Sequence, residues 1–176
     1  MTRGVFLDRD GVLVKEIVRG GRAYAPTRLE DFRLVPEAPA QVNRLRAAGL
    51  VCIVFTNQPE VSSGALSRDL LDTMHAQLRE SVAVEDILVC PHGAADGCDC
   101  RKPLPGMLHT GAAKWSLNLT ESFVVGDRWR DIDAGRAAGC FTLLLQRSYS
   151  ASDNADVTCQ HLTEAVDLIL ARVTDA

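Results

Sequence analysis

Short apolar runs alternate along the chain with longer stretches in which apolar residues recur every three or four positions. The runs are mostly Val, Ile, Leu and Phe without polar alternation, and they predict buried strands at residues 4–7, 51–55, 87–89, 122–125 and 141–145. The periodic stretches predict helices near residues 37–48, 67–82, 105–117, 130–138 and 161–173. Strands and helices in turn are typical of right-handed crossovers between parallel strands. The pattern therefore predicts an α/β fold built on a doubly wound parallel sheet.

Several helix ends carry local signals that agree with this pattern. Ser67 precedes an apolar-periodic stretch and is a suitable N-cap. Gly49 and Gly139 stand where helices are expected to stop, and Pro36 and Pro105 stand near expected starts.

Residues 11–35 depart from the strand–helix rhythm. They contain two short apolar pieces separated by Gly20-Gly21, which is typical of a hairpin. We expect this segment to form a short flap near residues 15–30. The intervals between strands are too short for a large cap domain, and 176 residues suit one domain spanning residues 1–176.

The charge balance narrows the possible partners. Nineteen basic and twenty-three acidic residues give a net charge of -4, and no Lys/Arg block indicates binding to nucleic acid. Asp8, Arg9 and Asp10 interrupt the region where a signal peptide would be apolar, and no run approaches the roughly 20 apolar residues of a membrane span. We therefore expect a cytoplasmic protein without membrane or nucleic acid partners, and a monomer.

Two aspartates directly follow the first predicted strand. In an extended chain, side chains at i and i+2 point the same way, so Asp8 and Asp10 can address one small site. This arrangement suits metal-assisted phosphate chemistry. The alternative is a solvated turn, because Asp and Gly are common turn residues.

Two later segments could supply groups for phosphoryl oxygens. Thr56 and Asn57 follow the second predicted strand, and their hydroxyl and amide groups can donate hydrogen bonds. Arg101 and Lys102 offer positive charge, which phosphoryl transfer requires. The alternatives are a turn cap for the first pair and solvated surface for the second.

A fourth segment, Val-Val-Gly-Asp-Arg-Trp-Arg-Asp, again places acids after a strand. If a helix begins after Gly126, Asp127 and Asp131 fall on one face of its first turns, although a capping role alone is the alternative. All four segments follow predicted parallel strands or the loops that leave them. Ligands of open α/β sheets bind at the carboxyl ends of the strands, so we expect these residues to converge on one site.

Three thiols and one imidazole lie within residues 90–100, in the spacing Cys-x-His-x5-Cys-x-Cys. Cys90, His92, Cys98 and Cys100 form a ligand set that can close a tetrahedral, structural zinc site. The alternatives are chance clustering or a redox pair formed by Cys98 and Cys100. A zinc ion here would hold Arg101 and Lys102 in place. The other cysteines, Cys52, Cys140 and Cys159, are expected only to pack.

The four segments, in the order Asp-x-Asp, Thr-Asn, Lys and Asp-xxx-Asp, resemble the four motifs of the haloacid dehalogenase superfamily of phosphatases. The cysteine and histidine loop next to Lys102 is similar to the zinc loop of its heptose bisphosphate phosphatase and histidinol phosphatase branch. The resemblance covers roughly residues 3–150. It implies a Rossmann-like fold, with a catalytic Mg²⁺ and a structural Zn²⁺.

The resemblance implies a two-step phosphoryl transfer through an aspartyl-phosphate on Asp8. Mg²⁺ would be held by the carboxylates of Asp8 and Asp127 and by the backbone carbonyl of Asp10. Asp10 would act first as general acid and then as general base. Thr56 and Lys102 would hold the phosphoryl oxygens.

The resemblance also implies that Asp131 would support the residues that contact the phosphate, or would position Lys102. Asn57, Arg101 and Arg128 would contact the rest of the substrate.

The substrate implied first is a sugar phosphate, heptose 1,7-bisphosphate with the 7-phosphate removed. The alternatives are histidinol phosphate or another small ester, and a phospho-acceptor module without turnover, against which Asp10 argues. Two positions depart from the family pattern. Residues 59–64 stand where the family commonly has a small residue, a glycine and later an arginine. Arg128 stands where a lysine is usual.

Overall fold

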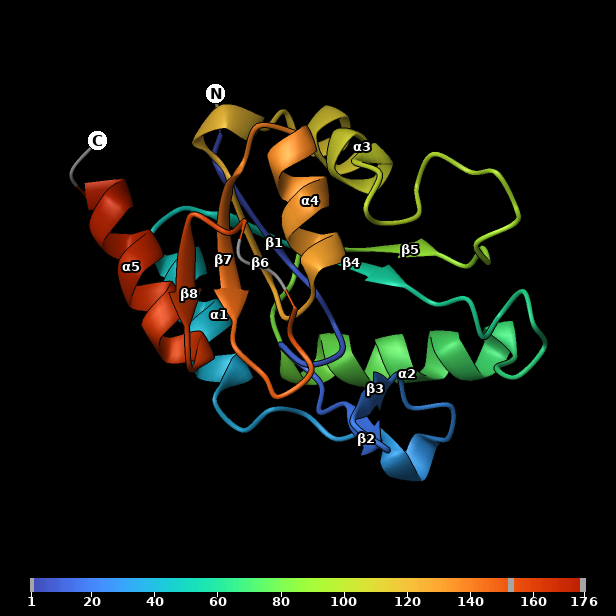
Figure 1. Cartoon of the computed structure of the whole chain (residues 1–176). Coiled ribbons are helices and arrows are strands. Elements are labelled where there is room, and N and C mark those ends of the chain that lie inside the picture. Colours follow the sequence, from blue (N-terminus) through green and yellow to red (C-terminus); the bar gives the residue numbers. More distant parts are fainter. Residues whose placement is uncertain (1, 152–153, 175–176) are drawn as a thin grey trace.

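The computed structural model describes residues 2–151 and 154–174, and within them six parallel strands form one sheet in the order β5-β4-β1-β6-β7-β8 (Figure 1). The six strands are β1 (Gly4–Leu7), β4 (Val51–Asn57), β5 (Asp86–Cys90), β6 (Phe123–Gly126), β7 (Phe141–Leu145) and β8 (Val157–Cys159). The α-helices are α1 (Ala38–Ala47), α2 (Arg68–Ser81), α3 (Gly106–Trp115), α4 (Trp129–Ala137) and α5 (Leu162–Thr174). The predicted doubly wound parallel sheet is confirmed.

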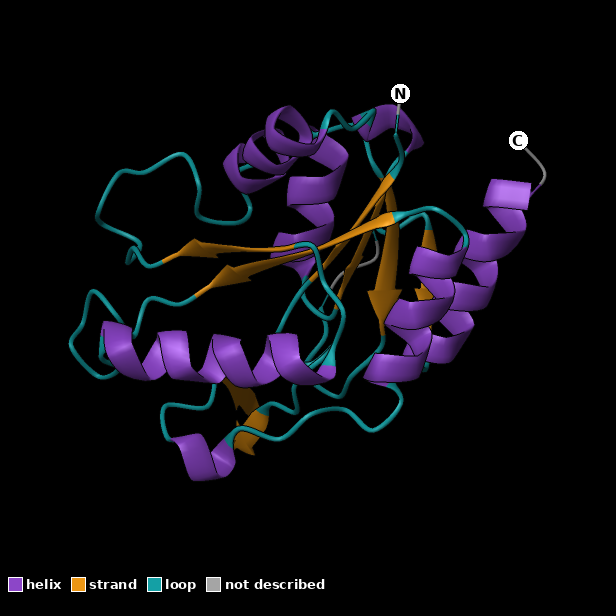
Figure 2. Ribbon diagram, turned by 180° about the vertical axis from the view of Figure 1, so that it is seen from behind, coloured by secondary structure: helices purple, strands orange, loops and turns teal. Residues whose placement is uncertain are grey.

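The strands are covered on both faces because their residues are apolar at consecutive positions. In β1, Val5 and Leu7 pack into one core and Phe6 packs into the other. The first core is closed by α1, α2 and α5, and the second by α3 and α4. Figures 1 and 2 show these two groups of helices on opposite sides of the sheet.

All five predicted strands and all five predicted helices are present, with ends displaced by at most two residues. The Ser67 hydroxyl accepts a hydrogen bond from Leu70 N at 3.2 Å, which confirms the predicted N-cap. Gly49 and Gly139 follow helices with φ values of 81° and 79°, a left-handed conformation that glycine adopts without steric cost.

One strand of the sheet was not predicted from the sequence. β8 pairs in parallel with β7 at the edge of the sheet, from Leu143 opposite Val157 to Leu145 opposite Cys159. Its three residues are too few to show periodicity, and its strand character comes from pairing with β7 rather than from its own sequence.

The predicted flap is also confirmed. Strands β2 (Ile17–Arg19) and β3 (Arg22–Tyr24) form an antiparallel hairpin whose turn is made by Gly20 and Gly21. The hairpin is followed by a 3₁₀ helix, η1 (Leu29–Asp31), and a second one, η2 (Leu119–Glu121), precedes β6. Within the described residues, every helix is too short or too polar to cross a membrane.

Candidate active site

A pocket opens at the carboxyl ends of β1 and β4 and is lined by residues from all four predicted segments. The predicted residues in its wall are Asp8, Asp10, Thr56, Asn57, Arg101, Lys102, Arg128 and Asp131. Asp127 lies beside them but is completely buried. The flap forms one wall through Ala23, Tyr24 and Ala25. Pro59, Glu60 and Arg130 also line the pocket, and no role for them was predicted from the sequence.

Lys102 is the cation at the centre of this site. Its Nζ lies 2.8 Å from Asp8 Oδ1 and 2.5 Å from Asp131 Oδ1, and it also donates to the Phe55 carbonyl at 3.0 Å. Burial by itself would lower the pKa of Lys102, but the carboxylates of Asp131 and Asp8 outweigh burial and raise it. Lys102 is therefore a permanent positive charge beside Asp8.

Asp8 follows β1 directly, and its hydrogen bonds fall on one oxygen. Oδ1 accepts from Arg9 N and from Lys102 Nζ, both at 2.8 Å. These bonds fix the carboxylate in the pocket and leave Oδ2 outside both contacts. The sheet edge thus holds Asp8 in an orientation suited to nucleophilic attack.

Asp127 follows β6 and precedes α4 by two residues. Asp127 and Asp131 do not share a helix face, because α4 begins at Trp129, and the alternative of a capping role holds for Asp131. Asp131 instead lies in the first turn, where its Oδ2 accepts from Arg128 N at 3.0 Å. The two acids nevertheless come together with Asp8, since ligand oxygens of the three lie within 4.8 Å of one another.

The acid cluster suits a hard divalent cation. Asp127 Oδ1 is buried and lacks a hydrogen-bond partner among the described residues, whereas Asp127 Oδ2 accepts from the Tyr149 hydroxyl at 2.5 Å. Both Asp131 oxygens already hold donors, so Asp127 Oδ1 and Asp8 are better placed to bind a metal. Gly11, with φ of 93°, is needed next to them because a Cβ there would lie 2.1 Å from Asp127 Oδ2. These observations fit Mg²⁺, which prefers carboxylate oxygens.

Without a metal, the Asp127 carboxyl makes stability depend on pH. Burial, together with the negative charges of Asp8 and Asp131, raises its pKa to about 8. The pKa of an unfolded Asp is about 3.9. Between pH values of about 4 and about 8 the folded state therefore holds one proton more than the unfolded state. The free energy of unfolding falls as the pH rises through this range. We expect the Mg²⁺-free protein to unfold more easily at pH 8 than at pH 6. Chemical unfolding at both pH values measures this difference.

Two comparisons test that expectation. Asp127→Asn should reduce this pH dependence, whereas Asp72→Asn, at an exposed position on α2, should leave it unchanged. Mg²⁺ competes with the proton, so it should stabilise the wild-type protein more at pH 8 than at pH 6. An equal pH dependence in wild type and Asp127→Asn would contradict the assignment to Asp127.

The Asp10 carboxylate is held by groups that were not singled out in the sequence. The Arg9 side chain, completely buried, contacts it through Nε at 3.0 Å and Nη2 at 3.0 Å, and Gln58 Nε2 donates to it at 2.8 Å. Arg9 Nη1 lies 3.1 Å from His75 Nε2, and burial together with the charge of Arg9 lowers the His75 pKa to about 3. A neutral His75 can therefore accept a hydrogen bond from Arg9. These contacts fix Asp10 at the pocket wall.

The remaining predicted residues are also placed by specific contacts. Thr56 Oγ1 accepts from Gln58 Nε2 at 2.8 Å, and the Asn57 amide makes two 3.1 Å hydrogen bonds with the backbone of Lys102. Arg101 Nη1 donates to the His92 carbonyl at 2.8 Å, and Arg128 Nη2 donates to the Ala23 carbonyl at 3.1 Å. Asn57 thus holds the lysine loop, and Arg128 links the pocket to the flap.

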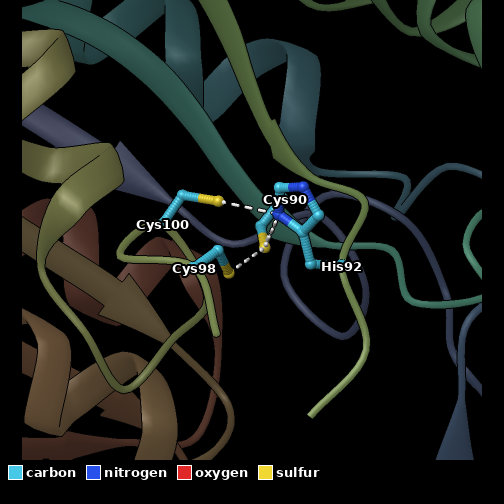
Figure 3. Close-up of side chains that lie close together, drawn as sticks. All are labelled: Cys90, His92, Cys98 and Cys100. Atoms are coloured by element: carbon cyan, nitrogen blue, oxygen red, sulfur yellow. Dashed lines mark hydrogen bonds between the residues drawn. The ribbon is translucent and has the colours of Figure 1, made fainter. Parts of the chain in front are cut away.

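Cys90 ends β5, and His92, Cys98 and Cys100 lie in the loop that follows it. The four side chains point toward one another (Figure 3). Ligand atoms of Cys90, His92, Cys98 and Cys100 lie within 4.8 Å of one another. The two sulfurs of Cys90 and Cys98 are 3.7 Å apart. A tetrahedral site with Zn–S bonds of about 2.3 Å separates its sulfurs by about 3.8 Å, so the cluster has the dimensions of a zinc site.

Comparisons with known proteins agree with this fold. A sequence profile of the HAD-hydrolase-like family, named for haloacid dehalogenases, matches residues 99–176. The D-glycero-beta-D-manno-heptose-1,7-bisphosphate 7-phosphatase of Pseudomonas aeruginosa PAO1 is 37% identical over 147 residues, which cover 81% of this chain and 80% of that protein. The D-glycero-D-manno-heptose-1,7-bisphosphate 7-phosphatase of Thermosynechococcus vestitus is 33% identical, and the match covers 94% of this chain and 94% of that protein.

Among solved structures, D,D-heptose 1,7-bisphosphate phosphatase from B. bronchiseptica, complexed with magnesium and phosphate, superposes with a TM-score of 0.83 at 27% identity. The match covers 97% of this chain and 99% of the other. The fold, the order of the four motifs and the relatives agree. The chain is a phosphatase, and it belongs to the D-glycero-D-manno-heptose-1,7-bisphosphate 7-phosphatase family of the haloacid dehalogenase superfamily.

Proposed function

We propose that this phosphatase removes the 7-phosphate of D-glycero-D-manno-heptose 1,7-bisphosphate in a Mg²⁺-dependent reaction. The observation that carries the chemistry is the contact of Asp8 with Lys102, next to Asp127, in a pocket that also contains Thr56. The observation that supports a bisphosphate is the presence of arginines in the same pocket, where Arg101 and Arg128 could bind a second phosphate. The names of the relatives point to the same substrate.

The proposed reaction proceeds in two steps. The Asp8 carboxylate attacks phosphorus, and the bond between phosphorus and the leaving oxygen breaks while Asp10 gives that oxygen a proton. Asp10, now ionised, then takes a proton from the water that cleaves the aspartyl-phosphate, which regenerates Asp8. Lys102 and Thr56 stabilise the phosphoryl oxygens as their charge develops.

The proposed metals have separate tasks. When bound by Asp8, Asp127 and the Asp10 carbonyl, Mg²⁺ supplies positive charge that offsets the repulsion between carboxylate and phosphate. Asp131 acts by positioning Lys102, to which it is bound at 2.5 Å. Zn²⁺ held by the four ligands of the β5 loop would be structural, because no coordination position remains for water.

Other proposed properties rest on the sequence. We keep the predictions of a single domain over residues 1–176, a monomer, a cytoplasmic location and no nucleic acid or membrane partner. The phospho-acceptor alternative receives no support, because the relatives reported above are named as phosphatases.

The function is tested by measuring phosphate release from heptose 1,7-bisphosphate, in both anomeric forms, beside histidinol phosphate. We expect release that requires Mg²⁺ and is at least tenfold more efficient, in kcat/KM, with a heptose bisphosphate than with histidinol phosphate. Phosphorus NMR of the product should show the 1-phosphate remaining. A preference for histidinol phosphate would replace the substrate assignment and leave the chemistry intact.

A further inference from the structure

The pocket contains a carboxylate that the proposed reaction does not use. Glu60 lies in the turns after β4 and lines the same pocket as Asp8 and Thr56. Its Oε2 is buried and has no hydrogen-bond partner among the described residues. A carboxylate oxygen withdrawn from water without a donor is unfavourable, so this atom is available to accept a hydrogen bond from a bound molecule.

The backbone around Glu60 is well anchored, which fixes where its side chain begins. The Glu60 carbonyl accepts from Leu66 N at 2.9 Å and from Ser63 Oγ at 3.2 Å, and Val61 N donates to the Gln58 carbonyl at 3.2 Å. The same Gln58 holds Asp10 and Thr56 through its amide nitrogen. The position of Glu60 is thus tied to the catalytic groups by a short stretch of chain.

The arginines of the pocket are occupied by contacts other than Glu60. Arg101 donates to the His92 carbonyl, Arg128 donates to the Ala23 carbonyl, and Arg130 lies 5.6 Å from the centre of the Trp129 ring. Arg101, Arg128 and Arg130 line the same pocket, and burial together with the charges of Arg128 and Arg101 lowers the pKa of Arg130. A ligand with an anionic group for these arginines and hydrogen-bond donors for Glu60 would form favourable interactions with both parts of the pocket.

The phosphoryl group itself is not the partner of Glu60, because two anions repel each other. The partner must be a donor on the part of the substrate beyond the ester oxygen. An ionised carboxylate has two acceptor oxygens and pairs well with two neighbouring hydroxyl groups. An alkyl or aryl leaving group offers no such donor and leaves Glu60 Oε2 without a hydrogen-bond partner.

Building on the proposed function, we propose that Glu60 is a specificity-determining residue that accepts hydrogen bonds from hydroxyl groups of the leaving alcohol. The site would then select phosphate esters of polyhydroxylated alcohols, and its arginines would add a preference for a second phosphate on the same molecule.

A pair of esters that differ only in hydroxyl groups tests this proposal. Glycerol 1-phosphate carries two neighbouring hydroxyls, and n-propyl phosphate has the same three carbons without them. Because a hydrogen bond to a charged group changes binding about 10- to 100-fold, we expect wild-type kcat/KM to favour glycerol 1-phosphate at least tenfold. Glu60→Gln keeps one acceptor oxygen but loses the negative charge, so it should lower that ratio at least about threefold, mainly by lowering the value for glycerol 1-phosphate.

Glu80→Gln, at an exposed position on α2, is the matched control and should keep the wild-type ratio. A structural role of Glu60 would lower kcat/KM equally for both esters, and that outcome would overturn the proposal, as would an unchanged ratio in Glu60→Gln. The thermal midpoint of each variant identifies any general loss of folding. The two small esters give an answer even if the heptose assignment fails, so the two proposals can fail separately.

Discussion

Replacing Asp8 with asparagine is expected to reduce phosphate release by at least about four orders of magnitude. The amide that replaces the carboxylate is a poor nucleophile and cannot form the aspartyl-phosphate. It also removes the anion that Lys102 contacts at 2.8 Å, so the lysine would remain paired with Asp131 alone. Phosphate release under saturating Mg²⁺ measures the loss. Acid-quenched wild-type enzyme should carry a phosphate on Asp8, and the variant should carry none.

The folded state should survive this substitution, and that separates loss of chemistry from loss of structure. Asp8 is one of three carboxylates whose oxygens lie within 4.8 Å of one another. Replacing it with asparagine removes one negative charge and relieves the repulsion between these groups in the Mg²⁺-free protein. We expect the thermal midpoint of Asp8→Asn without Mg²⁺ to equal or exceed that of wild type. If Asp8→Asn retained activity within tenfold of wild type, the nucleophile would have to be a different group.

Asp8, Thr56 and Asp127 could be assigned to one site from the sequence because each stands at the end of a parallel strand. The apolar runs identified the strands, and the rule for open sheets brought their ends together. This reasoning needs only the strand order and the residue types. It does not need the direction of any long side chain.

The supporting contacts could not be predicted in the same way. Arg9 stands between two aspartates in the sequence, but its binding to Asp10 and His75 depends on a side-chain direction and on a helix that lies 66 residues further along the chain. Tyr149 reaches Asp127 from the loop after β7, which carries no repeated pattern. Glu60 was visible only as a departure from the family pattern. Only the structure shows that Glu60 Oε2 is buried without a hydrogen-bond partner among the described residues.

The clustering of the cysteine and histidine side chains was predictable for the opposite reason. The four residues lie within eleven positions, and three thiols with one imidazole at this density are a suitable ligand set for zinc. The sequence also placed the loop directly before Lys102. What could not be predicted is that Asn57 holds the same lysine through two hydrogen bonds.

The other large effect, on both stability and activity, is expected from Cys98→Ser. Loss of a thiolate ligand should remove zinc, which we expect to lower the free energy of unfolding by more than about 3 kcal/mol, because metal binding contributes directly to folding. Lys102 lies two residues from the last ligand, Cys100, so kcat/KM should also fall about 10- to 100-fold as the lysine loop loosens. Zinc content by elemental analysis, chemical unfolding and phosphate release measure the three effects.

Three variants distinguish the contribution of zinc from that of the loop itself. Cys98→His keeps a zinc ligand and should retain more metal and activity than Cys98→Ser, whereas Cys140→Ser, outside the cluster, should keep full zinc content. Asn57→Ala removes the two hydrogen bonds to Lys102, so it should lower activity while zinc stays bound. If Cys98→Ser lost its zinc but kept wild-type stability and activity, the metal would not position Lys102. Asn57, Asp131 and the Phe55 carbonyl would then hold the lysine against Asp8 without help from a metal.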